Sequence, residues 1–480
     1  MNLQIPKRRR RAWGLAAAAV ALATGGIVLS TTPEPASAVP ALVAPTVASP
    51  TTASGAPRVA LQGPRVDGFF AFTEGAALEG GVRALYAELR LTGEQGGVAR
   101  RAPVSLAVVL DHSGSMNGDK IVQAREAVVS LLARMHDDDR LAVIVYDHEA
   151  QVLQPLASVR ELRETLPARV RAVTADGGTN IPAGLDLGAR ALAAAPSDHV
   201  RRLVLVSDGQ DGSGEALPSI ATRVASRASE RVTTSSLGIG VDYDERFLGT
   251  VADSGRGNYA FLSDGAQLDP FLRQELEQAS STVADDVVAE IDLPAGAMLR
   301  HAHGAVASIE GTRVRLPLGT LFAGERRKVV LELAAPIGAS GSLASSAVRV
   351  RYVTVEDGTA RAIDGGVASV RAVASASEVE ASRDVELHAD ALATAIDAQQ
   401  VAAITAWQEG RRDEALRMTD TNLAELQRAN AAAPSPAYAA RIDALRRDRS
   451  SFEQTEAASG AGRSYSLSRG AARRASAEAF

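Results

Sequence analysis

The sequence contains no cysteine and few aromatic residues. Without cysteine, the chain can form no disulfide, zinc–thiolate site, iron–sulfur cluster or lipid anchor on an N-terminal cysteine. Aromatic residues make up only 4% of the 480 residues, which offers no platform for stacking nucleic-acid bases. The net charge of −6 also disfavours attraction to nucleic acid. We therefore expect no nucleic-acid partner. The length of 480 residues is enough for two or three domains, and the 46% hydrophobic content allows them to fold.

The first 57 residues have the composition of an export signal followed by a linker. The basic run "KRRRR" precedes the uncharged stretch "AWGLAAAAVALATGGIVLS", and "PEPASA" ends at Ala38. This order predicts a secretory signal peptide over residues 1–38, although an uncleaved membrane anchor is an alternative. Residues 39–57 are rich in Pro, Ala, Ser and Thr and predict a flexible linker. We expect an exported protein that is periplasmic, cell-surface or secreted.

The middle of the chain, residues 101–282, alternates strand-length apolar runs with helical segments. The runs "VSLAVVL", "LAVIVY", "RLVLVS" and "TTSSLGIGV" are apolar on both faces, as strands covered by helices on both sides must be. This alternation predicts an α/β fold with a doubly wound, mostly parallel sheet. The domain lacks the G-x-x-x-x-G-K-[ST] loop of nucleotide-binding proteins, and "LGIGVD" does not open a helix.

The segments on either side of this domain predict β-structure. In residues 58–100, the side chains of Leu85, Ala87, Leu89 and Leu91 share one strand face, and residues 283–375 contain further alternating runs. Because the first segment cannot bury its apolar face alone, we predict one β-sandwich built from both flanks, with the α/β domain inserted into it. Residues 376–457 predict a helical region, and residues 458–480 a disordered basic tail.

Polar residues follow the apolar runs at three places in the predicted sheet. Asp111, Ser113 and Ser115 follow the first strand, Thr179 precedes a helix, and Asp208 follows "LVLVS". Ligands bind at the carboxyl ends of the strands in such sheets, and a buried carboxylate requires a partner. Hydroxyl and carboxylate oxygens suit Mg²⁺, with Mn²⁺ or Ca²⁺ as alternatives. The competing interpretation is that Asp111, Ser113 and Thr179 only cap the helices that follow them.

The segments "DHSGSM", "GGTN" and "SDG" resemble, in order, the metal-ion-dependent adhesion site (MIDAS) of von Willebrand factor type A (VWA) domains. The resemblance covers about residues 100–282, and similar layouts occur in exported bacterial proteins and in heavy chains of inter-alpha-trypsin inhibitor. It implies that Ser113, Ser115 and Thr179 contact the metal directly or nearly so. It further implies that Asp111 and Asp208 act largely through bound waters.

The resemblance implies a binding function rather than catalysis. We predict a non-enzymatic adhesion or assembly module whose metal captures an acidic side chain of a partner protein. One alternative is a structural scaffold, in which the metal only adds stability and the C-terminal helices bind the partner. A second alternative is a metal-dependent hydrolase. Contact with a membrane is expected only if the N-terminal segment stays uncleaved.

Overall fold

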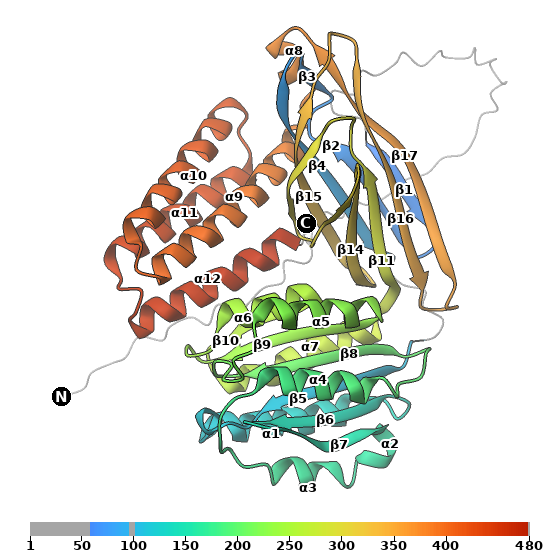
Figure 1. Ribbon diagram of the computed structural model, residues 1–480, viewed down its shortest axis with the longest axis vertical. Coiled ribbons are helices and arrows are strands. Elements are labelled where there is room, and N and C mark those ends of the chain that lie inside the picture. Colours follow the sequence, from blue (N-terminus) through green and yellow to red (C-terminus); the bar gives the residue numbers. More distant parts are fainter. Residues whose placement is uncertain (1–57, 96–100, 479–480) are drawn as a thin grey trace, which may run out of the picture. The chain divides into compact units, whose positions relative to one another are not determined.

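The computed structural model describes residues 58–95 and 101–478, so the predicted signal peptide and linker lie outside the described residues. An α/β domain occupies the region between residues 101 and 282 (Figure 1). Its six-stranded sheet has the order β10-β9-β8-β5-β6-β7, and only β7 is antiparallel to its neighbour. The strands are β5 (Val104–Asp111), β6 (Arg140–Tyr146), β7 (Ala150–Ser158), β8 (Val200–Ser207), β9 (Val232–Ile239) and β10 (Arg256–Leu262).

Helices cover both faces of this sheet, which is why strands such as β5 are buried along their whole length. One face packs against α1 (Asp119–Arg134), α2 (Val159–Leu162), α3 (Leu166–Arg171) and α7 (Leu268–Ser280). The other face packs against α4 (Ile181–Leu192), α5 (Leu217–Ser229) and α6 (Glu245–Gly255). Two short 3₁₀ turns, η1 (Gly114–Met116) and η2 (Gly265–Gln267), complete the domain.

Strands from both flanks of the α/β domain form a β-sandwich, and the predicted fold class is confirmed. The first sheet contains, in order, β1 (Val59–Gly63), β2 (Val66–Phe72), β4 (Val82–Gly93), β15 (Arg326–Pro336) and β12 (Met298–His303). The second contains β13 (Ser308–Glu310), β14 (Arg313–Phe322), β11 (Thr282–Asp292), β16 (Leu343–Thr354), β17 (Ala360–Val373) and β3 (Ala76–Leu78). The inner faces share one apolar core, which includes the four residues of β4 picked out by alternation.

The chain enters and leaves the α/β domain at neighbouring points. Arg101 donates a hydrogen bond to Ser280 Oγ over 3.2 Å. Helix α7 ends at Ser280 and β11 of the sandwich begins at Thr282. The N-terminal end of β5 therefore lies on the sandwich side, and its carboxyl end, at Asp111, is on the opposite edge of the sheet.

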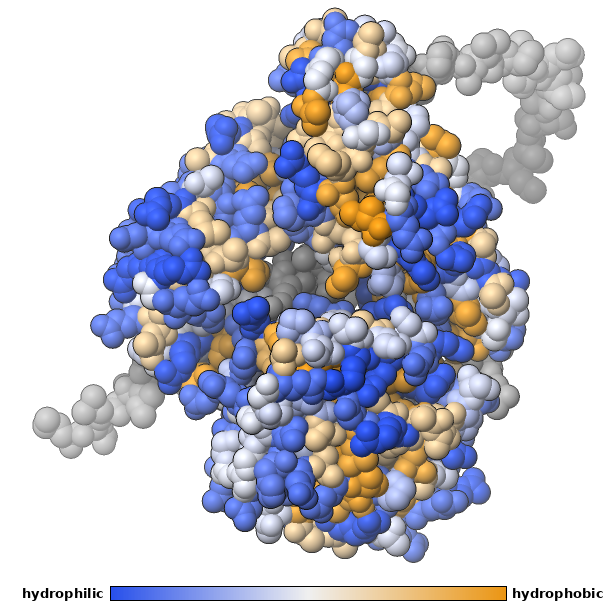
Figure 2. Space-filling model, in the orientation of Figure 1, coloured by the Kyte–Doolittle hydropathy of each residue, from blue (hydrophilic) through white to orange (hydrophobic). Residues whose placement is uncertain are grey.

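The helical region, residues 376–478, follows the sandwich. It comprises α8 (Ala376–Ala381), α9 (Val385–Gln408), α10 (Arg412–Ala432), α11 (Pro436–Gln454) and α12 (Gly460–Glu478). Buried apolar residues hold α9, α10 and α11 together, and the outer surface of α10 and α11 is mostly hydrophilic in Figure 2. Within the described part of the chain, no helix has both the length and the apolar character needed to cross a membrane.

The C-terminal segment differs from the expectation of a disordered tail over residues 458–480, because it forms α12. Its low-complexity composition conceals apolar positions: Leu467 and Ala471 are buried against the α/β domain, and Tyr465 packs edge-on against Trp407. Arg469 Nε also donates to the buried carboxylate of Asp448 over 2.9 Å. These contacts hold α12 against α9 and against β10, the outer strand of the α/β sheet.

Candidate functional site

The predicted site residues come together at the carboxyl edge of the α/β sheet. Strands β5 and β8 are parallel neighbours, so Asp111 at the end of β5 lies close to Asp208, which directly follows β8. The loop before α4 reaches the same edge, because Gly212 N donates to the carbonyl of Thr179 over 2.7 Å. A backbone bond from Gly114 N to the Gly177 carbonyl also ties this loop to the first one.

Asp111 is completely buried and fully supplied with hydrogen-bond donors. Its Oδ1 accepts from Ser113 N over 2.8 Å, and its Oδ2 accepts from Ser207 Oγ over 2.8 Å. The hydroxyl of Tyr146 lies 3.3 Å from the same Oδ2 and 3.0 Å from the Val206 carbonyl. Burial raises the pKa of Asp111, while the bonds from Ser113 and Ser207 act in the opposite direction. The carboxylate is thus fixed in orientation before any ligand binds.

Ser113, Ser115 and Asp208 form a hydrogen-bonded chain beside Asp111. The hydroxyl oxygens of Ser113 and Ser115 are 3.1 Å apart, and Ser115 Oγ donates to Asp208 Oδ1 over 2.7 Å. Asp208 is completely buried, so its second oxygen also requires a partner. Lys120, on the first turn of α1, supplies it through a direct ion pair with Asp208 Oδ2. Lys120 Nζ also lies 3.4 Å from the carbonyl of Ser115.

The hydroxyl groups of Thr179 and Ser115 both lie beside Gly209. A β-carbon at Gly209 would lie 3.5 Å from Thr179 Oγ1 and 3.6 Å from Ser115 Oγ, so this glycine keeps the space between the two hydroxyls open. The five predicted residues therefore converge from three segments. Two of the segments end strands, and the third is the loop that leads into α4.

The interpretation of these residues as helix caps fails. Helix α1 begins after Gly118, which has a φ of 85° and makes no side-chain cap, so neither Asp111 nor Ser113 caps it. The cap of α4 is Asn180, whose side chain accepts from Ala183 N over 3.1 Å, and not Thr179. Asp111, Ser113 and Thr179 therefore do not act as side-chain caps of α1 or α4.

The sequence analysis missed three residues of the site: Ser207, Tyr146 and Lys120. Ser207 and Tyr146 are the last residues of β8 and β6, and both face Asp111. Burial, followed by the charge of Asp111, raises the pKa of Tyr146 well above its usual value, so it stays a neutral donor. The end of a strand beside a candidate carboxylate is the signal that could have identified Ser207 and Tyr146. Lys120 carries no such signal, because it lies on a helix.

The donor set fits a hard divalent cation. It offers two carboxylates and three hydroxyl groups at one edge, which are the oxygen ligands that Mg²⁺, Mn²⁺ and Ca²⁺ accept. Among the described residues, no group of three or more His, Cys, Asp or Glu side chains could hold a metal ion. A cation at this edge would therefore depend on the serine and threonine hydroxyls, as in the predicted site.

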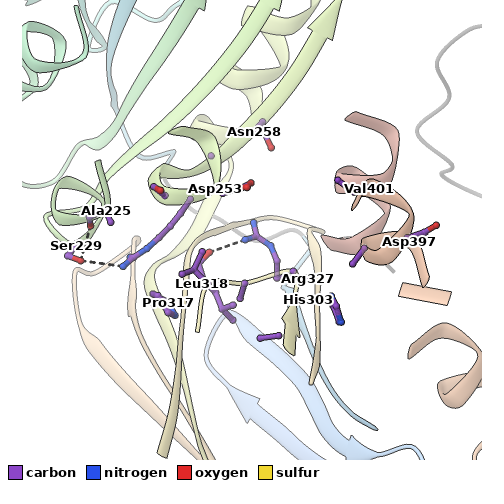
Figure 3. A pocket seen from close by; sticks show the side chains of 18 residues that line it. Ala225, Ser229, Asp253, Asn258, His303, Pro317, Leu318, Arg327, Asp397 and Val401 are labelled. Carbon is purple, nitrogen blue, oxygen red and sulfur yellow. Dashed lines mark hydrogen bonds between the residues drawn. The ribbon is translucent and has the colours of Figure 1, made fainter. Parts of the chain in front are cut away.

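A separate cavity of about 500 Å³ lies where the α/β domain, the sandwich and α9 meet (Figure 3). Its lining is mixed, but the guanidinium groups in it are already engaged. Arg327 donates to the carbonyl of Leu318 over 3.0 Å and pairs with Glu325, and Arg256 donates to the carbonyl of Ala228 over 3.3 Å. The cavity shares no residue with the candidate site.

The fold and the site together define a doubly wound α/β domain with oxygen ligands gathered at the carboxyl edge of its sheet. Residues 105–274 match the model of the von Willebrand factor type A domain. The chain therefore contains a VWA domain, in agreement with the resemblance drawn from the sequence. Domains of this family are generally protein-interaction and adhesion modules.

Known proteins match this chain over different lengths. An uncharacterized protein of Synechocystis sp. is 26% identical over 333 residues, which cover 67% of this chain and 78% of that protein. Human inter-alpha-trypsin inhibitor heavy chain H4 is 32% identical over 159 residues, 31% of this chain, and the match spans only 17% of that relative. A von Willebrand factor type A structure from Catenulispora acidiphila superimposes with a TM-score of 0.60 at 22% identity, covering 78% of this chain and 89% of that one. The shared fold thus extends beyond the VWA domain.

Proposed function

We propose that this protein is an exported, non-enzymatic binding protein whose VWA domain holds a divalent cation and uses it to capture an acidic side chain of a partner protein. The observation that carries the proposal is the convergence of two buried carboxylates with hydroxyl groups from two loops at one exposed edge. Export rests on the composition of residues 1–38. The bound cation would supply a Lewis-acidic position open to an outside carboxylate.

The chain's own residues would hold the cation in place. Ser113, Ser115 and Thr179 would present hydroxyl oxygens to it, and Mg²⁺ is the expected ion, with Mn²⁺ or Ca²⁺ as alternatives. Asp111 and Asp208 would supply negative charge while remaining fixed by their own hydrogen bonds. Supporting partners of this kind orient metal ligands and tune the site.

The charge of the site favours an anionic partner. Asp111 and Asp208 carry two negative charges, and the ammonium group of Lys120 offsets one of them. A divalent cation therefore leaves the site with net positive charge, which an outside carboxylate neutralises. The position of the site, at the edge opposite the attachment to the sandwich, keeps it accessible to a large partner.

Calorimetric titration of the full chain with Mn²⁺ tests the metal site directly. We expect one binding site in the unmodified protein and at least a tenfold weaker one in Thr179→Ala. The matched control is Thr250→Ala, which removes a hydroxyl bonded to the Arg246 carbonyl on α6 and should leave the affinity unchanged. Equal affinity in Thr179→Ala and the unmodified protein would contradict the metal site.

Partner capture from intact cells, with Mg²⁺ or with EDTA, tests the use of that site. We expect a partner that is retained in Mg²⁺, released by EDTA and absent from the Thr179→Ala sample. A partner that stays bound in EDTA would instead support the scaffold alternative, in which the helical region makes the contact. The two measurements separate a failure of metal binding from a failure of metal-dependent capture.

A further inference from the structure

Charged side chains form part of the contact between α9 and the sandwich. Arg90 on β4 donates to Glu88 Oε1 over 2.8 Å and to Asp390 Oδ2 over 2.7 Å. Lys328 on β15 donates to Asp390 Oδ1 over 3.0 Å. Asp390 belongs to α9, so both strand cations are joined to the helix through one carboxylate.

Glu88 is the least satisfied member of this cluster. Its side chain is completely buried, and that of Lys328 is 2% exposed. Glu88 Oε1 is bonded to Arg90, but Glu88 Oε2 has no hydrogen-bond partner among the described residues. A buried carboxylate oxygen without a partner is costly when charged and much less so when protonated.

The apolar clusters that include α9 residues join this helix to the other helices of the helical region. The two hydrophobic clusters that join α9 to α10, α11 and α12 contain no residue of the sandwich. The sandwich core in turn contains no residue of α9. The helical region is also attached by a backbone bond from Asp384 N to the Thr73 carbonyl and by the packing of α12 against the α/β domain. The charged cluster is therefore one part of the attachment, and that part can respond to protonation without disturbing either core.

Arg90, Lys328 and Asp390 act on Glu88 directly, and other titratable groups lie on the same elements. The residue that pairs with Glu88 on β2 is the uncharged Ala71. The titratable or charged neighbours on β4, β15, β12 and α9 are Tyr86 and Arg90, Lys328 and Glu332, His303, and His388 and Asp390, respectively. Burial lowers the pKa of His388 to about 4 and raises that of Tyr86 to about 12, so both stay neutral between pH 5 and pH 9.

We propose that Glu88 is a pH-sensitive latch, which in its protonated form holds the helical region on the sandwich and on ionisation loosens it. Burial raises the pKa of Glu88 from 4.5 to about 7, against the opposing effect of Arg90. Docking is accordingly favoured below pH 4.5, weakens as the pH rises to about 7 and changes little above that. The docking equilibrium constant should fall by roughly 70-fold between pH 5 and pH 8.

Two adjacent residues of β15 provide a matched pair of probes. Val329 and Val330 are both completely buried, but they point to opposite faces of the strand. Val329 lies in the sandwich core, whereas Val330 shares the outer face with Lys328 and lies opposite Glu88 in the sheet. Since the chain has no cysteine, Val330→Cys and Val329→Cys each introduce a single thiol. Labelling of the first reports undocking, and labelling of the second reports opening of the sandwich.

We expect Val330→Cys in the full chain to react faster than Val329→Cys at every pH. Its opening constant, corrected for the reactivity of a free thiol, should rise roughly 70-fold from pH 5 to pH 8. Adding Glu88→Gln, which resembles the protonated acid, should make that constant nearly independent of pH. Adding Glu332→Gln, which removes the carboxylate bonded to His303, should preserve the rise.

Two results would overturn the latch. An unchanged pH dependence in the Glu88→Gln background would assign the titration to another group. Equal labelling rates at positions 330 and 329 would show that the helical region leaves only when the sandwich itself opens. The latch does not depend on the metal site, so neither result bears on partner capture.

Discussion

The VWA domain and the sandwich each bury a carboxylate completely, and the two are satisfied in opposite ways. Asp111 receives donors on both oxygens, from Ser113, Ser207 and the nearby Tyr146 hydroxyl. Glu88 has a donor, Arg90, on one oxygen only, and its other oxygen has none within the described chain. Neutral donors on both oxygens fix the orientation of the Asp111 carboxylate. A single cation beside an unpaired oxygen instead allows Glu88 to gain or lose a proton.

The largest expected effect comes from breaking the one bond that Glu88 has. Arg90→Met should destabilise the fold by about 3 kcal/mol, because it leaves the buried Glu88 without its hydrogen-bond donor, while Asp390 keeps Lys328. Chemical denaturation at pH 8 measures the change. Arg349→Met removes an exposed pair with Asp364 and should cost under about 1 kcal/mol. Similar losses in the free energy of unfolding for the two variants would contradict the expectation that the buried ion pair matters more than the exposed one.

Removing charge from Asp111 should act on the metal more than on the fold. Asp111→Asn should weaken Mn²⁺ binding by about 100-fold, since one of two negative charges is lost and an amide group replaces an acceptor opposite the Ser207 donor. Calorimetry measures the affinity. Asp269→Asn, which affects a carboxylate on α7 paired with Arg134, is the control and should bind as the unmodified protein does. Undiminished affinity in Asp111→Asn would contradict the proposed role of this residue.

Tyr146→Phe removes a donor near Asp111 while keeping the packing of the ring. We expect a loss of about 1 kcal/mol in the free energy of unfolding, since the Val206 carbonyl also loses its contact. Mn²⁺ affinity should fall only a few-fold, because Ser113 and Ser207 still hold the carboxylate. Thermal denaturation with and without Mn²⁺ separates the two effects, and a loss of affinity as large as that of Asp111→Asn would show that the hydroxyl itself is essential.

The smallest effect concerns the charge of Lys120. Lys120→Met should tighten Mn²⁺ binding about threefold, because a cation beside Asp208 is removed and the ammonium group is partly exposed to solvent. Capture of a carboxylate partner should weaken at the same time, since the occupied site is less positive. Lys120→Arg keeps the charge and should preserve both properties. Weaker metal binding in Lys120→Met would mean that the ion pair mainly positions Asp208.

Much of the fold could be predicted because burial imposes simple patterns on strands. Runs apolar on both faces marked β5, β6 and β8, and period-two alternation marked β4. Helix α12 was missed because its apolar residues, Tyr465, Leu467 and Ala471, are sparse within a Ser-, Arg- and Ala-rich segment. Its order depends on the elements that receive those side chains, and a local pattern does not contain that information.

The site was similarly predictable only in part. Asp111, Ser113, Ser115, Thr179 and Asp208 could be picked out because each occupies a turn directly after a strand or before a helix. Whether they bind a metal stays a prediction. Lys120 could not be picked out, since its contact with Asp208 spans 88 residues and reflects how α1 is placed against β8. The unpaired oxygen of Glu88 was hidden for the same reason, because its surroundings include Lys328 and Asp390, which are distant in the sequence.

The packing of α12 against β10 has a consequence for the solubility of shortened chains. Strand β10 ends the α/β sheet and, among the described strands, pairs only with β9, so its outer backbone groups can recruit a strand from another molecule. Leu467 and Ala471 of α12 share an apolar cluster with Phe261 of that strand. A chain cut before residue 460 would expose both the strand edge and the apolar surface, and so would self-associate more readily than the intact protein. We therefore expect the C-terminal helix to limit self-association of the protein.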